Sequence, residues 1–224
     1  MSDSTSTSGF SVSRLILVPA IISLAVTVLR LVGELQHWPS PLFKAQAGGG
    51  GAIVGIAWLP LIFGPYFALK LTDAGMEAKG VGKTIGMVLL GIIVLVGGGV
   101  LLGAPIITFP GHEILGILLL GAAGLLPLVG WPALTKTLIA YGYSARIPVA
   151  ILMFFALQGH WGTHYDALPP NYAGPTEFLG MYIFIGLVPQ LIIWISYTVL
   201  LGSLAGAITV AIARRGKSAA ATAS

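Results

Sequence analysis

The stretch 84-TIGMVLLGIIVLVGGGVLLGAPII-107 decides the fold class of this chain. It contains no charged residue. About 20 residues of α-helix, rising about 1.5 Å each, are enough to cross a hydrocarbon core of about 30 Å, and this stretch is longer than that. We therefore predict that it forms a membrane-spanning α-helix.

The composition of the whole chain agrees with this prediction. Hydrophobic residues make up 56% of the 224 residues and charged residues only 8%, whereas a soluble domain carries about a quarter charged residues. The chain has no cysteine, which excludes thiolate metal sites, cysteine nucleophiles and cofactors linked through cysteine. Positive charges stand at the ends of apolar segments rather than on one basic face, so membrane lipids and not nucleic acid are the expected partners.

Further apolar segments predict an all-α integral membrane protein, a bundle of about six transmembrane helices. Three of these segments occupy residues 14–34, 51–70 and 112–130, and the C-terminal third supplies the remainder. Residues 1–13 are polar and rich in Ser and Thr, which predicts a disordered tail. A single transmembrane domain of residues 14–213 follows, and residues 214–224 form a basic, then small-residue, C-terminal tail.

Residues 133–158 allow two interpretations. Polar residues alternate with apolar ones over 133–145, and Gly142 and Ser144 interrupt the pattern, which predicts a short interfacial helix. A separate membrane helix would then begin near Arg146. The alternative is one helix over 133–158, which would place Arg146 in the middle of the membrane, where a charge is costly and usually functional. We expect the first arrangement.

The last apolar segment, residues 177–213, would be about 55 Å long as a straight helix, which is too long for one untilted crossing. Pro189 must kink or break it. Two separate crossings would need a turn, and 194-WISY-197 contains no turn-forming residue. We therefore predict one bent, proline-kinked last helix.

Six crossings place most of the basic residues on one side of the membrane. By the positive-inside rule this side is cytoplasmic and carries both termini, as expected for a multi-pass protein of the cytoplasmic (inner) membrane. The basic residues on this side are Arg14, Lys70, Lys79, Lys83, Lys136, Arg146, Arg214, Arg215 and Lys217. Only Arg30 and Lys44 fall on the outer side.

Glycine recurs at GxxxG spacing, which lets helix backbones approach closely and predicts a tightly packed bundle. The matches are 51-GAIVG-55, 82-GKTIG-86, 99-GVLLG-103 and 202-GSLAG-206. The same spacing fits a homo-oligomer or a membrane complex. A non-catalytic assembly subunit is therefore one hypothesis of function.

The leading hypothesis concerns the outer side, where this topology gathers all four histidines. Pairs of polar residues three or four apart lie on one face if the chain is helical there, and imidazoles with carboxylates suit a divalent metal ion. The candidate metal ligands are Glu34, His37, His112, His160, His164 and Asp166. An enzyme built on such a metal would hydrolyse or transfer groups on a lipid-linked substrate, and the sequence leaves open whether the protein is an enzyme.

The same residues also have a simpler interpretation. The glycines of 159-GHWGTH-164 favour a turn over a helix, and the neighbouring Trp and Tyr rings suit the headgroup level of a membrane. Glu34 can pair with Arg30 at i,i+4 spacing. An outer face of this kind would contact lipid headgroups rather than a metal ion.

The third hypothesis is a small-solute permease. Pro60, Pro65 and Pro189 could break helices within the membrane, as broken helices do in transporters. The candidate ligand or path residues are Arg30, Arg146 and Gln190. A nucleotide site is excluded, because 80-GVGKT-84 has Glu77 where a phosphate-binding loop needs its first glycine.

Overall fold

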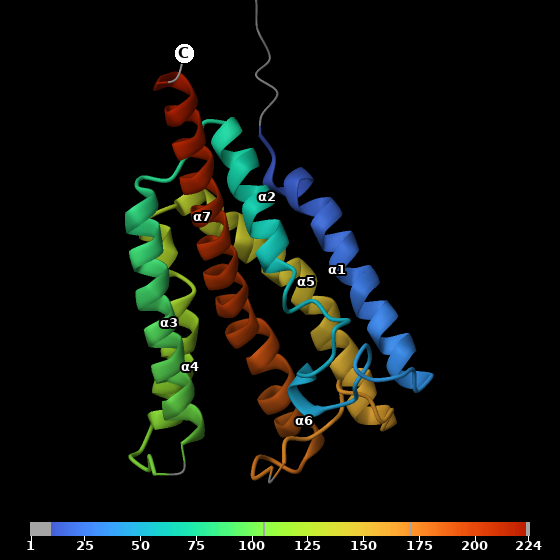
Figure 1. The fold of residues 1–224 in the computed structure, drawn as a ribbon. Helices are drawn as coiled ribbons and strands as arrows, with labels where there is room; N and C mark the ends of the chain where they lie inside the picture. Colours follow the sequence, from blue (N-terminus) through green and yellow to red (C-terminus); the bar gives the residue numbers. More distant parts are fainter. Residues whose placement is uncertain (1–9, 105, 171, 223–224) are drawn as a thin grey trace, which may run out of the picture.

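The computed structural model describes residues 10–104, 106–170 and 172–222 of the chain. Every regular element in these ranges is a helix, and five helices are long and apolar enough to cross a membrane. The start of α1 and the end of α7 lie at the same end of the bundle, here called the termini end, and the longer connections lie at the opposite, loop end (Figure 1). The protein is an all-α membrane protein, as the sequence predicts.

Helix α1 (Val12–Leu35) begins at Ser11, whose hydroxyl accepts a hydrogen bond from the backbone N–H of Arg14. Such a side-chain cap satisfies one of the free N–H groups at a helix start. The helix packs along α5 through small and polar residues, and Ser23 Oγ lies 2.8 Å from the Tyr141 hydroxyl. Its opposite face is apolar and exposed, as expected for a surface that contacts lipid.

Helix α2 (Pro60–Asp73) begins nine residues later than the predicted segment 51–70. Gly48, Gly49 and Gly51 adopt left-handed backbone angles before it, with φ of 72°, 72° and 76°, and residues with such angles do not continue a helix. Its 14 residues span about 21 Å, which is less than a hydrocarbon core. The rest of the predicted segment, residues 51–59, is irregular chain toward the loop end and not helix.

Helices α3 (Val81–Gly103) and α4 (His112–Ala123) form a close antiparallel hairpin (Figure 1). A Cβ added to Gly98 would lie 2.9 Å from the carbonyl oxygen of Gly116, so the two backbones touch there. A 3-10 turn, η2 (Leu126–Val129), follows α4 and leads into the next helix.

Helix α5 (Pro132–Gly159) is one continuous helix, so the expected break after residue 145 is wrong and the alternative interpretation holds. Gly142 is not a breaker but a contact, because a Cβ added to it would lie 3.2 Å from Ile195 Cδ1 of α7. Ser144 bonds through its hydroxyl to the Tyr141 carbonyl, and Pro148 lies inside the helix. Membrane helices tolerate an internal proline where neighbouring groups and local adjustment satisfy the backbone.

The last helical segment is continuous, as predicted, and Pro189 lies inside it. It comprises α6 (Phe178–Met181), two π-helical stretches, η3 (Tyr182–Leu187) and η4 (Pro189–Ile193), and α7 (Trp194–Thr222). The wider turns of a π-helix accommodate irregularities and are frequent at functional sites. Helix α7 also continues through most of the predicted C-terminal tail.

One of the GxxxG matches packs two helices tightly. A Cβ added to Gly64 of α2 would lie 2.7 Å from Cα of Gly202, and one added to Gly206 would lie 2.8 Å from Cβ of Ala68. The hydrophobic core surrounds this contact, and its fully buried side chains include Phe67, Leu71, Trp131, Leu134 and Leu138. The match 202-GSLAG-206 therefore serves the fold of the chain itself, whereas added Cβ atoms at Gly82, Gly86, Gly99 and Gly103 would meet open space.

Candidate functional site

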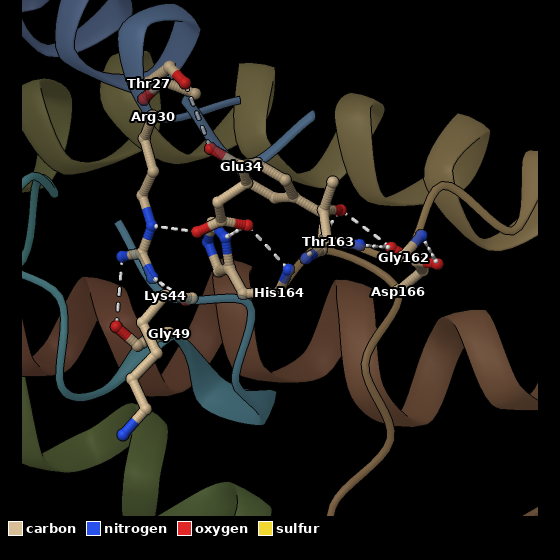
Figure 2. Close-up of polar contacts among 10 residues, drawn as sticks. Thr27, Arg30, Glu34, Lys44, Gly49, Gly162, Thr163, His164 and Asp166 are labelled. Atoms are coloured by element: carbon tan, nitrogen blue, oxygen red, sulfur yellow. Dashed lines mark hydrogen bonds and ion pairs between the residues drawn. The ribbon is translucent and has the colours of Figure 1, made fainter. Parts of the chain in front are cut away.

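Glu34, in the last turn of α1, is the centre of a buried polar cluster at the loop end (Figure 2). Its Oε1 accepts a hydrogen bond of 2.8 Å from Arg30 Nε. Its Oε2 accepts two more, each of 2.8 Å, from the backbone N–H and the ring Nδ1 of His164. Glu34 is 4% exposed. A buried carboxylate needs such partners, and all of them are drawn from α1 and the loop after α5.

The loop after α5 holds His164 in place through a tight turn. The carboxylate of Asp166 accepts hydrogen bonds from the backbone N–H groups of Gly162 and Thr163, at 2.9 and 2.8 Å, and from the Thr163 hydroxyl at 2.7 Å (Figure 2). Carboxylates commonly cap turns in this way. The next residue, Tyr165, is buried and donates its hydroxyl hydrogen to the Thr27 carbonyl of α1 at 3.2 Å.

The surroundings of His164 favour the neutral form of its ring, in a defined tautomer. Burial lowers the pKa of His164, and the Arg30 charge lowers this pKa further, although the Glu34 carboxylate acts in the opposite direction. Because a carboxylate only accepts hydrogen bonds, Nδ1 carries the hydrogen and Nε2 keeps a lone pair. The Cδ2–Nε2 edge faces Gly49, since a Cβ added to that glycine would lie 3.1 Å from Cδ2 and 3.6 Å from Nε2.

The glycine-rich segment before α2 covers the other side of Arg30. The guanidinium donates from Nη1 to the Gly49 carbonyl at 3.0 Å and from Nη2 to the Lys44 carbonyl at 3.3 Å (Figure 2). A Cβ added to Gly55 would lie 3.0 Å from Nη1. The charge of Arg30 is therefore balanced by Glu34, and three of its N–H donors have acceptors.

Arg146 lies in the middle of α5, with about 20 Å of helix on each side of it. It is 5% exposed, its Nη1 donates to Gln190 Oε1 at 3.3 Å, and its Cζ lies 4.4 Å from the ring centroid of Trp194. A cation over an aromatic face is favourable. Within the part of the chain that the structure describes, Arg146 forms no ion pair with a carboxylate.

A cavity of about 420 Å³ joins these two groups of residues. It lies between the segment preceding α2, helix α5 and the π-helical stretches η3 and η4, and aliphatic and aromatic side chains make up most of its wall. The polar residues that line it are Thr27, Arg30, Arg146, His164, Tyr165 and Gln190. All three residues that the sequence proposes as ligand or path residues therefore border one cavity, although they come from three helices.

The histidines and carboxylates proposed as metal ligands do not gather in the same way. Among the described residues no group of three or more His, Asp or Glu side chains could hold a metal ion. His37 and His160 are exposed, His37 two residues after the end of α1 and His160 directly after the end of α5. His112 points back to α3, with Nδ1 2.8 Å from the Leu101 carbonyl oxygen. Only Glu34 and His164 meet, and Asp166 is occupied by its own turn.

Tyr165 and Trp194 belong to the site and are not foreseen by the sequence. Tyr165 follows the pattern of an aromatic ring at the headgroup level, yet it is 2% exposed and packs on His164 with ring centroids 3.8 Å apart. Burial raises its pKa, so its hydroxyl stays protonated. Trp194 stands four residues after Gln190, a helical spacing that places both on the face toward Arg146. That spacing is the available sequence signal.

No family model, curated protein or solved structure matches the chain. The fold and the site nevertheless define a class of protein. It is a multi-pass all-α membrane protein with a mostly apolar cavity that is bordered by a buried arginine in the middle of a helix long enough to span a membrane.

Proposed function

We propose that the protein binds an anionic amphiphile, such as a lipid with a phosphate headgroup or a fatty acid, in the cavity beside Arg146. One observation carries the proposal, namely that Arg146 is buried in the middle of α5 and opens on this cavity without a carboxylate partner among the described residues. An arginine at the centre of a membrane helix costs about 2.5 to 3.5 kcal/mol on insertion scales, and such residues usually serve function.

The donor geometry of Arg146 fits an oxyanion. A guanidinium has five N–H donors, and one of them is used by Gln190 while the described residues offer no further acceptor. A carboxylate or phosphate accepts two parallel hydrogen bonds from such a group. The apolar remainder of the wall suits a hydrocarbon tail, since small-molecule sites combine an apolar lining with a few placed polar groups.

This proposal keeps the lipid-headgroup part of the outer-face hypothesis and moves it to the cavity. The metal part finds little support, because both oxygens of Glu34 are already engaged by Arg30 and His164. A bound anion would lie beside two guanidinium groups, of which only that of Arg146 lacks a balancing charge.

The test is binding of decanoate and of phosphatidylglycerol to the purified protein in nanodiscs of a zwitterionic lipid. Isothermal titration reports decanoate binding and native mass spectrometry reports retained phosphatidylglycerol. Arg146→Gln should weaken both by about tenfold or more, the value of one or two charge-assisted hydrogen bonds. Lys136→Gln is the matched control, because Lys136 is an exposed cation on the same helix. Equal binding by the wild type and by Arg146→Gln would overturn the proposal.

A permease for such an anion is the second candidate function. Two features favour it, since both the irregular chain before α2 and the π-helical stretches around Pro189 line the cavity. Interrupted helices at a midplane site are typical of transporters. Efflux of a radiolabelled carboxylate from vesicles, compared between the wild type and Gln190→Leu, tests this function. Efflux that is no faster than from protein-free vesicles would exclude transport and leave binding intact.

For either function we propose that the termini end faces the cytoplasm and the loop end faces outward. The basic residues support this orientation through the positive-inside rule. The absence of cysteine allows a clean test with single cysteines at the exposed positions Ser40 and Ala74, one at each end. An impermeant thiol reagent added to intact cells should label Ser40→Cys and not Ala74→Cys, and the reverse pattern would invert the topology.

A further inference from the structure

We infer that the ligand carries a neutral hydrogen-bond donor, a hydroxyl group, in addition to its anionic group, and that Nε2 of His164 is the atom that recognises it. This inference deepens the proposed function and rests on it. It would narrow the ligand class to hydroxylated anionic amphiphiles, such as hydroxy fatty acids or phosphodiesters of a polyol.

The hydrogen-bond inventory of the cavity carries the inference. The Thr27 hydroxyl already donates to the Ser23 carbonyl, and the Tyr165 hydroxyl donates to the Thr27 carbonyl. The side-chain oxygen of Gln190 already accepts from Arg146. Nε2 of His164 differs from these atoms, because it has a lone pair and no hydrogen-bond partner among the described residues.

The surroundings fix this acceptor in one orientation. Glu34 holds both the backbone N–H and the ring Nδ1 of His164, so the ring cannot flip without losing a hydrogen bond to a buried carboxylate. The Asp166 turn fixes the backbone on which the ring stands. A bound ligand would exclude water from Nε2, which lies at an apolar wall. A ligand without a donor would therefore leave Nε2 without a hydrogen bond, and an unpaired polar atom lowers the affinity.

The charge of the site selects among possible donors. Arg30 and Glu34 neutralise each other, His164 is neutral, and Arg146 leaves the cavity with one net positive charge. An ammonium group on the ligand would add a second positive charge inside the membrane. A hydroxyl group donates without this charge, so it is the donor that the site favours.

Matched probes separate the hydroxyl from the rest of the ligand. Decanoate, 3-hydroxydecanoate and 10-hydroxydecanoate share a chain and a carboxylate, with the hydroxyl absent, near the head or at the tail. A second arm compares phosphatidylglycerol with phosphatidylethanol, two phosphodiesters of which only the first has headgroup hydroxyls. At least one hydroxylated probe should bind wild-type protein about tenfold tighter than its partner. The arm that responds tells whether the hydroxyl belongs to a fatty acid or a lipid headgroup.

The variant His164→Asn removes the acceptor at the Nε2 position, which the shorter side chain does not reach, and keeps a donor for Glu34, because the amide N–H₂ of asparagine can take the place of Nδ1–H. It should bind decanoate like the wild type but lose the preference for the hydroxylated probe, whereas His160→Asn, a change at an exposed residue, should keep that preference. Wild-type protein that binds decanoate through Arg146 but shows no hydroxyl preference in either arm would overturn the inference alone. If the binding of decanoate and phosphatidylglycerol did not depend on Arg146, the proposed function would be overturned instead.

Discussion

Glu34 and His164 are 130 residues apart in the chain, yet one carboxylate oxygen of Glu34 accepts two hydrogen bonds from His164. Both residues lie near the ends of helices that pack against each other, Glu34 at the end of α1 and His164 just after α5. The contact therefore joins two helices at the loop end and holds His164 at the wall of the cavity. It is the structural basis for the first two predictions.

Replacing Glu34 by Gln should strongly destabilise the protein. The change removes the one carboxylate that pairs with Arg30 among the described residues and leaves three buried donors with a poorer acceptor. Breaking a buried ion pair by removing one partner costs about 3 to 5 kcal/mol. Reversible unfolding in mixed micelles measures this free energy, and Glu113→Gln, at an exposed residue, serves as the control. A loss of less than about 1 kcal/mol would show that Arg30 finds another partner.

The stability of the protein should fall as the pH drops below about 6.5. Burial lowers the pKa of His164 from its ordinary value of 6.5 in the folded protein, so the unfolded chain takes up a proton more readily. The neutral His164 contributes its full stability above the pKa of the unfolded chain. This contribution decreases as the pH falls below that value, and it stops decreasing below the pKa of the folded protein. Thermal midpoints between about pH 8 and pH 5 measure the slope. His164→Asn should flatten it, and an unchanged slope would assign it to other groups.

Replacing Arg146 by Met should stabilise the ligand-free protein while it weakens anion binding. A buried charge without an ion-pair partner costs free energy, and its hydrogen bond to Gln190 and its contact with Trp194 offset only part of that cost. We expect a gain of about 1 to 2 kcal/mol in the free energy of unfolding. A loss of stability would mean that Arg146 serves packing rather than ligand binding.

The close contact between α2 and α7 predicts a sharp difference between two glycine substitutions. Gly64→Ala adds a Cβ that would lie 2.7 Å from Cα of Gly202, and backbone cannot move aside easily. We expect it to cost about 2 kcal/mol or more, within the range for overpacking a core. Gly86→Ala meets open space on α3 and should be neutral or stabilising by up to about 1 kcal/mol. Equal effects in thermal unfolding would contradict the helix packing.

The helices that could be predicted are those that length and apolarity define without help from other parts of the chain. This holds for α1, α3, α4 and the last helical segment. Two predictions were wrong for opposite reasons, namely the start of α2 near residue 51 and the break of α5 after residue 145. Glycines before α2 end the helical pattern through their left-handed backbone angles, whereas Gly142 inside α5 supports a helix contact. Sequence alone does not distinguish a glycine that breaks a helix from one that packs it.

The candidate site shows the same division between local and distant relationships. The pairing of Arg30 with Glu34 follows from their spacing on one helix and was predictable. The approach of His164 depends on how α1 and α5 pack, and the use of Asp166 depends on the turn it closes. The predicted topology placed all four histidines on one side of the membrane, but it did not predict which of them would contact a carboxylate.

The π-helical stretches before α7 make the cavity depend on the number of residues as well as on their identity. A π-turn holds more residues than the 3.6 of an α-turn, so deleting one residue from η3 or from η4 would bring that stretch closer to α-helical winding. Because each residue of a π-turn contributes a smaller rotation than the about 100° of an α-helical residue, this change of winding compensates for most of the lost residue, and the helix on either side keeps nearly the same orientation. Different side chains of the shortened stretch would then face the cavity, although the hydropathy of the segment would hardly change. The wall of the cavity would therefore change, while the packing of α7 against α2 would be kept.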